Sequence, residues 1–246
     1  QKRKTRERGV MRHGGALGVL SSWVLCRHGA AALRAARPTR RGVGGDRAFT
    51  ALRSASPGAC CPVASTAAWV RHVVVHLALC PWAAETIAKE RMSVVDATRE
   101  DAMAAAVAAM DATAETPQST TLVALRRDMD WETYWALAAD VDSLLDSRGL
   151  RGVVQLATFH PRYRFDGGDV DAAEHWTNRS PFPLLHFLRE DDVEAALRTV
   201  GIDGDGDSEP IWQKNVATCQ RLGAIDLESR LQQCLVDSQG LPGADR

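Results

Sequence analysis

The densest group of polar side chains in the sequence lies between Phe159 and Glu190. The candidate functional residues in it, which have acid/base, hydrogen-bonding or anion-binding groups, are His160, Tyr163, Asn178, Arg179, Ser180, His186 and Arg189. Imidazoles transfer protons near neutral pH, and guanidinium forks bind phosphate and carboxylate groups. Pro181 and Pro183 stiffen the segment, which favours preorganised side chains. The group therefore predicts acid/base chemistry on an anionic small molecule.

Two residues outside this segment extend the predicted chemistry. Cys80 precedes Pro81, which marks the predicted end of a helix, and is a candidate nucleophile. A nearby imidazole would activate its thiol if the fold brings His160 or His186 close to it. Arg91 joins the arginines of the segment as a candidate anion-binding residue. In this interpretation His160, His186 and Cys80 are catalytic, and Arg179, Arg189, Asn178, Ser180, Tyr163 and Arg91 bind the substrate.

Each assignment has a structural alternative. Cys80 can be a buried small apolar residue, as free cysteines usually are. His160 can order the turn that follows its strand, and His186 can fill a half-buried strand position. The arginines can pair with surface acids such as Glu190. The sequence leaves these alternatives open.

Metal binding is a further alternative, in which Cys80, His160 and His186 are the ligands. His72 and His76 have a chelating spacing but lack the glutamate of an HExxH motif. The segment 203–207 lacks the glycine and glutamate of a calcium loop and is typical of a solvated acidic turn. Nucleotide-binding glycine loops and a GxSxG motif are also missing from the sequence. No particular cofactor is indicated.

The elements that must position these residues alternate between helix and strand. Hydrophobic spacing predicts strands over residues 91–98, 120–126, 153–159 and 184–188. Helices are predicted near residues 66–80, 101–113, 130–149, 191–201, 210–223 and 227–236. This order predicts an α/β or α+β two-layer sandwich with a sheet of about four strands and helices packed on it. A ferredoxin-like split βαβ arrangement is the nearest common template.

Charge divides the chain into segments of opposite sign. Residues 1–64 carry 13 basic and two acidic side chains, whereas the rest carries 17 basic and 29 acidic ones. An Arg- and Ala-rich segment with few acids is typical of an organelle transit peptide, and it lacks the interleaved aromatic residues and the lysine run of a nucleic-acid-binding tail. Its apolar run at 16–26 is too short to span a bilayer. Since Met11 is the first methionine, residues Gln1–Val10 are a candidate artefact of the gene model.

We therefore expect a targeting leader and linker over 1–64, one α/β domain over 65–237 and a disordered tail over 238–246. The expected location is an organelle matrix or stroma, mitochondrial or plastid, after removal of the leader. We expect no transmembrane segment and no nucleic-acid partner, and the sequence does not determine the oligomeric state.

Several short motifs resemble a known family. They are Leu79-Cys80-Pro81-Trp82-Ala83, Phe159-His160-Pro161 with Tyr163 and Phe165, Thr177-Asn178-Arg179-Ser180-Pro181-Phe182-Pro183, Leu185-His186, Leu188-Arg189-Glu190, Asn215 and Leu222-Gly223. Over roughly residues 66–223 the chain resembles the bacterial domain-of-unknown-function family 1415. Trp176 stands where that family usually has tyrosine. The resemblance implies an organelle form of a bacterial-type protein, and it implies no particular reaction, substrate or cofactor.

The leading functional hypothesis is an organelle enzyme that acts on an anionic small molecule by acid/base or thiol chemistry. Phosphate-containing molecules are among the candidate substrates. The alternatives are a non-catalytic module that binds a protein or metabolite, and a metal-binding protein. The three differ in geometry. Convergence of Cys80, His160, Arg179 and His186 on one cavity would favour the enzyme and metal hypotheses, whereas a binding module predicts a shallow surface around residues 176–190.

Overall fold

A computed structural model describes residues 60–165, 169, 171–199 and 210–235. The predicted tail, the acidic segment 203–207 and most of the predicted leader lie outside the described residues. The first described helix, α2 (Pro62–Trp69), begins with a proline at its first turn, where the missing N–H costs nothing. In the described part of the chain, no helix is both long and apolar enough to cross a membrane.

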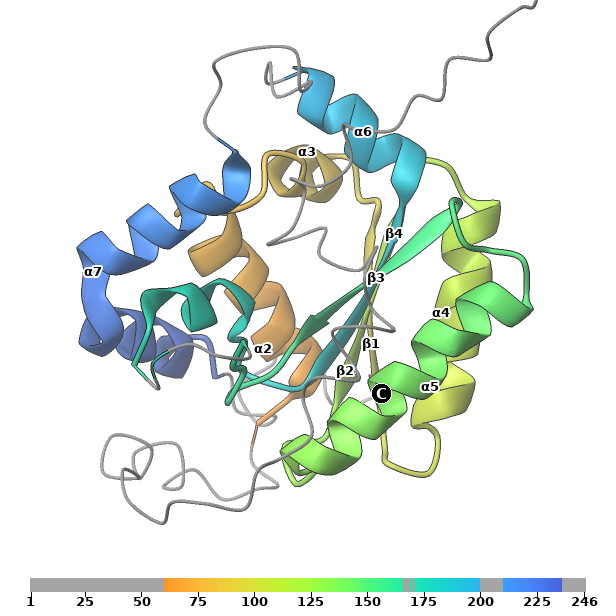
Figure 1. The fold of residues 1–246 in the computed structure, drawn as a ribbon, viewed down its shortest axis with the longest axis horizontal. Coiled ribbons are helices and arrows are strands. Elements are labelled where there is room, and N and C mark those ends of the chain that lie inside the picture. The colour runs from red at the N-terminus through yellow and green to blue at the C-terminus, as the bar shows by residue number, and fades with distance from the viewer. Residues whose placement is uncertain (1–59, 166–168, 170, 200–209, 236–246) are drawn as a thin grey trace, which may run out of the picture.

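One mixed sheet of four strands forms the centre of the fold (Figure 1). Its strands are β1 (Met92–Ala97), β2 (Thr120–Leu125), β3 (Val154–Phe159) and β4 (Leu184–Arg189), in the spatial order β1-β2-β4-β3. β1 and β2 are parallel, and β4 runs antiparallel to both β2 and β3. β1, β2 and β3 therefore finish at the same end of the sheet, which we call the carboxyl end. The opposite end is the amino end.

The predicted mixed α/β class and the four-stranded sheet are confirmed, but helices cover both faces of the sheet. Figure 1 shows α4 (Ala102–Glu115) and α5 (Trp131–Ser147) on one face, and α2 with α7 (Ile211–Gln233) on the other. All six residues of β2 are buried, because its alternate side chains enter two separate cores. The domain thus has three layers, with the sheet between two layers of helices, where the sequence predicted two layers.

The strand connections contain the predicted split βαβ unit. β2 and β3 are parallel, are joined through α5, and have β4 between them, antiparallel to both. Beside it, β1, α4 and β2 form an ordinary βαβ crossover, in which β1 and β2 pair directly and α4 packs back on these two strands.

Local signals placed several helix ends correctly. Asp130 caps α5 by accepting the Thr133 backbone N–H at 2.7 Å. Gly149, which follows α5, has a φ of 67°, the left-handed conformation that ends many helices. The two predicted C-terminal helices meet within α7 at Gly223, whose non-helical conformation, with a φ of 76° and a ψ of 162°, kinks the element.

Three short helical segments were not predicted as separate elements. The first predicted helix continues from α2 into a π-helical segment, η2 (Val70–Val75). A short helix, α3 (Ala83–Ala88), follows Pro81, and a 3-10 helix, η3 (Ala173–Asn178), precedes the Arg179 region. The remaining helix, α6 (Glu190–Thr199), starts directly after β4. The three short segments span at most two turns each, too few for hydrophobic periodicity to reveal them.

Candidate functional site

The structure brings Cys80 and His186 together at the amino end of the sheet. Both line a cavity of about 30 Å³ between η2, α3 and the sheet, large enough for one or two water molecules. The rest of its wall is mostly apolar and includes Trp69, Val74, Met92 and Leu122. His186 reaches this face because it pairs with Leu122 and Ala157, whose side chains belong to the same core.

Thr120 fixes the tautomer of His186. Its hydroxyl donates to the Phe187 carbonyl oxygen at 2.7 Å and lies 2.6 Å from His186 Nε2. Because that hydroxyl proton is already committed, Nε2 must carry a proton and donate it to Thr120 Oγ1. The other ring nitrogen, Nδ1, is then a lone-pair acceptor. It is buried and has no hydrogen-bond partner among the described residues.

Burial keeps both groups of the cavity uncharged. It lowers the pKa of His186 to about 3. It also raises the pKa of the Cys80 thiol, an effect that hydrogen bonds from the backbone N–H groups of Trp82 and Ala83 partly oppose. At neutral pH the cavity therefore contains a thiol and a neutral imidazole with a free lone pair. This is a different state from a thiolate–imidazolium ion pair.

A larger pocket of about 180 Å³ adjoins this cavity, and Trp82 and Thr86 line both. It opens between α3 and α6, and its lining includes the cations Lys89 and Arg91 and the carboxylates Glu85 and Asp192. Lys89 is paired with Glu85 on the same helix, whereas Arg91 has no carboxylate within ion-pair distance among the described residues. The Arg91 guanidinium is therefore the available anion-binding group of this pocket.

Arg189 does not line either space. Its guanidinium donates to the Ala114 carbonyl oxygen and lies 3.8 Å from Asp192 and 4.0 Å from Asp191. These contacts join the end of β4 to α4 and α6. Arg189 therefore pairs with neighbouring acidic side chains, which is the structural alternative that the sequence left open.

His160 lies at the carboxyl end of the sheet and does not meet His186. It follows Phe159, whose side chain enters the same core as His186, so the His160 ring turns to the opposite face. There it packs against Trp131 and Tyr134 at centroid distances of 5.0 and 5.1 Å. The predicted histidine pair, and a metal site that combines both histidines with Cys80, therefore do not converge.

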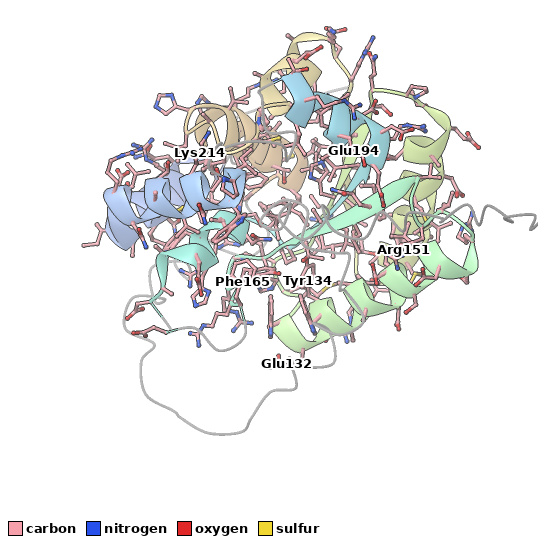
Figure 2. The ribbon with its side chains drawn as sticks, turned by 45° about the horizontal axis from the view of Figure 1, so that its top comes forward. Glu132, Tyr134, Arg151, Phe165, Glu194 and Lys214 are labelled. Atoms are coloured by element: carbon pink, nitrogen blue, oxygen red, sulfur yellow. The ribbon has the colours of Figure 1, made fainter. Side chains whose placement is uncertain are left out.

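The surroundings of His160 fit the structural alternative. Its Nδ1 accepts the Arg162 backbone N–H at 3.0 Å, which orders the turn after β3. Burial lowers its pKa to about 3, and the Met129 carbonyl partly opposes this shift. Figure 2 places Tyr134 between α5 and the sheet, where its hydroxyl donates to the Leu184 carbonyl oxygen at 2.8 Å. His160 is thus part of the core beneath α5.

Three of the predicted substrate-binding residues are buried, and two of them, Asn178 and Ser180, use their side-chain polar groups inside the protein. Asn178 Nδ2 donates to the Thr158 carbonyl oxygen at 3.0 Å, and its own carbonyl accepts the His160 N–H. Ser180 Oγ donates to the Phe182 carbonyl oxygen at 2.5 Å. The buried Tyr163 ring packs edge-on against Trp131 and Trp135. These side chains hold the segment between β3 and β4 in place.

The metal hypothesis gains no support from the described residues. His72 and His76 are exposed and line an open pocket with Cys234. In the described part of the chain, no three His, Cys, Asp or Glu side chains are grouped closely enough to hold a metal ion. The spacing of His72 and His76 is therefore a weak signal.

Sequence reasoning missed Thr120, Trp82 and Thr86. Thr120 begins the predicted strand 120–126 and lies two residues from Leu122, so both face the same side of the sheet. Alternation along the strand would have placed it there once its pairing with the 184–188 strand was known. Trp82 and Thr86 lie on α3, which was not predicted.

The fold and the cavity define an α/β domain with a helix-covered mixed sheet and a small thiol–imidazole cavity at its amino end. The chain belongs to the family described as "Protein of unknown function (DUF1415)", whose family model matches residues 62–229. This confirms the resemblance inferred from the motifs. Comparisons with curated proteins and with solved structures found no match.

Proposed function

We propose that the protein is an enzyme that uses the Cys80 thiol to attack an electrophilic carbon of an anionic small molecule. His186 accepts the thiol proton, Thr120 orients the imidazole, and Arg91 binds the anionic group in the adjoining pocket. The observation that carries the proposal is the shared cavity of Cys80 and His186, in which the buried Nδ1 has no hydrogen-bond partner among the described residues.

The arrangement contains the parts that nucleophilic catalysis requires. A base lines the same cavity as the nucleophile, and a third group holds the base in one tautomer. With a carbonyl substrate, the bond from sulfur to carbon would form as the carbonyl π bond breaks. The thiol proton would pass to His186 Nδ1 and then to the carbonyl oxygen. The addition needs no oxidant, and it begins from the neutral groups that this apolar cavity favours.

The size of the two spaces supports a small substrate, and Arg91, which has no ion-pair partner among the described residues, supports an anionic one. The inner cavity admits only a few heavy atoms, whereas the outer pocket has room for the rest of a metabolite-sized molecule. Arg91 would bind a carboxylate or phosphate there by a bidentate contact. We also propose an organelle matrix or stroma as the location, which the basic composition of residues 1–64 supports.

Alkylation of Cys80 tests this proposal, with iodoacetate as an anionic reagent and iodoacetamide as its neutral counterpart. Each forms a bond from carbon to sulfur and releases iodide. At each cysteine, the rate with iodoacetate divided by the rate with iodoacetamide measures the preference for the anionic reagent. We expect this ratio to be about tenfold higher at Cys80 than at Cys61, because Arg91 attracts the carboxylate. Arg91→Gln should remove the preference, and Arg221→Gln, on the exposed surface of α7, should leave it unchanged. Peptide mass spectrometry measures both rates.

The base is tested with the same reagents. His186→Asn and Thr120→Val should each slow alkylation of Cys80 by both reagents, by about tenfold or more for His186→Asn. An unreactive Cys80 in the folded wild-type protein would refute the enzyme hypothesis. Rates that depend on Arg91 but not on His186 would instead favour the non-catalytic binding module.

A further inference from the structure

The Thr177-Asn178-Arg179-Ser180 motif lies at the carboxyl end of the sheet. The side chains next to Arg179 in this motif are already hydrogen-bonded within the protein. Thr177 Oγ1 donates to the Glu174 carbonyl oxygen at 2.6 Å and lies 3.0 Å from Asn178 Oδ1. Asn178 and Ser180 bond to backbone carbonyls of β3 and of the following turn. Arg179 is the member of the motif whose terminal donors have no partner among the described residues.

Arg179 is nevertheless held in a defined position. Its guanidinium carbon lies 4.3 Å from the ring centroid of the buried Trp176, a stacked cation–π contact. Its Nε donates to the Tyr163 carbonyl oxygen at 3.4 Å. With one face on the indole and Nε directed to the backbone, the two terminal nitrogens remain for a ligand. A planar fork fixed in this way is preorganised for an oxyanion.

Protein carboxylates do not neutralise this guanidinium directly. Among the described residues, none forms an ion pair with Arg179 within 4.0 Å. Glu228 on α7 and Asp171 are near enough to raise its pKa, but burial and the positive charge of Arg164 outweigh them and lower the pKa to about 10. Glu228 Oε1 instead accepts a hydrogen bond from Gln232 at 3.0 Å. A half-buried cation without a paired carboxylate favours an external anion.

We propose that Arg179, together with Arg164, forms a phosphate-binding site at the carboxyl end of the sheet. Two guanidinium groups suit a doubly charged phosphate better than a single carboxylate. Arg164 is exposed and lies on the segment that leads away from β3, so it can close over a ligand held by Arg179. Ligands of α/β sheets commonly bind outside the carboxyl ends of strands.

This site is separate from the one proposed for Cys80. The strand register places Leu125, Phe159 and Leu184 at the end of the sheet near Arg179, and Met92 and Thr120 at the opposite end, beside the cavity of Cys80. The two proposals can therefore succeed or fail independently. A phosphate bound at Arg179 would be a second ligand and would not be the group attacked by the thiol.

Isothermal titration calorimetry of the purified full chain with inorganic phosphate, and with chloride at equal ionic strength, tests the site. We expect saturable binding of phosphate that Arg179→Gln weakens at least about tenfold, because an ionised donor pair is lost. Arg164→Gln should weaken binding several-fold. Arg162→Gln is the matched control, an exposed arginine of the same segment, and should bind like the wild type.

Arg164→Gln keeps the test decisive if Arg179→Gln does not fold, since an exposed side chain can be replaced without disturbing the core. Arg164→Gln should also leave the alkylation preference of Cys80 unchanged, which separates this proposal from the previous one. An absence of phosphate binding by the folded wild type would overturn the inference. Equal loss of affinity in Arg162→Gln would do so too, because it would indicate only diffuse surface charge.

Discussion

The protein should lose stability steeply as the pH falls from about 6.5 toward 3. His160 and His186 each have a native pKa of about 3, lowered mainly by burial, against about 6.5 in an unfolded chain. Between these values the unfolded state binds more protons than the native state, so acid favours unfolding. Each histidine lowers the free energy of unfolding by about 1.4 kcal/mol per pH unit within this window. Above the window the stabilising effect is complete.

Urea denaturation from pH 4.5 to 7.5 measures this effect. Replacing either buried histidine by asparagine should remove a large part of the slope between pH 4.5 and 6.5, although each variant will also be less stable overall. Burial also lowers the pKa of His175, so His175 should contribute part of the slope that remains in these variants. His72→Asn is the control, since this exposed side chain should leave the slope unchanged. A wild-type slope near zero would show that both imidazoles are accessible to protons.

Removing the Arg151 side chain should cost about 2–3 kcal/mol of unfolding free energy, because it leaves the buried Asp142 carboxylate without a partner. Arg151 bonds to both oxygens of Asp142, at 3.0 and 3.2 Å, and to Asp146. The Asp142 side chain is 8% exposed and that of Arg151 is 35% exposed. Solvent therefore screens the pair in part, and the cost should be below that of a fully buried ion pair.

Arg148→Ala provides the matched control for Arg151→Ala. Arg148 also pairs with an aspartate, Asp111, at 2.6 Å, but both side chains are 39% exposed. Exposed pairs contribute about 0–1 kcal/mol. The two arginines lie at the same end of α5, and Figure 2 shows Arg151 there. Urea denaturation at pH 7 measures the loss of unfolding free energy in each variant. Equal losses in the two variants would contradict the claim that burial of Asp142 makes the loss of Arg151 more costly.

The strands could be predicted from the sequence almost to the residue. The run Thr120–Leu125 is rich in β-branched and apolar residues, and its burial on both faces leaves a continuous hydrophobic signal. The same holds for β3 and β4. Caps such as Asp130 and Gly149 are local in sequence, so local reasoning found them. The number of layers is not local, because it depends on which helix packs against which face.

The convergence of side chains depended on the pairing of distant strands. Phe159 and His160 are neighbours, yet they lie on opposite faces of the sheet, and only the pairing of Ala157 with His186 fixes which face each histidine occupies. One clustered polar segment in the sequence thus becomes two separate sites. Cys80 and His186 share a cavity, and Arg179 lies at the other end of the sheet.

The motif residues also divide by how their polar atoms are used. Asn178 and Ser180 are candidate ligand-binding groups in the sequence, but Asn178 bonds to the backbone of β3 and Ser180 closes the turn between η3 and β4. A sequence motif cannot distinguish a side chain that binds a ligand from one that holds its neighbour in place. Arg179 differs from the other residues of the motif because its terminal donors have no hydrogen-bond partner among the described residues.

A crystal structure of the protein after reaction with iodoacetate is the most direct test of the Cys80 site. We expect a carboxymethyl group on Cys80 that passes Trp82 and Thr86 and places its carboxylate within hydrogen-bonding distance of the Arg91 guanidinium, with His186 still bonded to Thr120. A folded protein with Cys80 unmodified, or an adduct whose carboxylate points away from Arg91, would contradict this expectation.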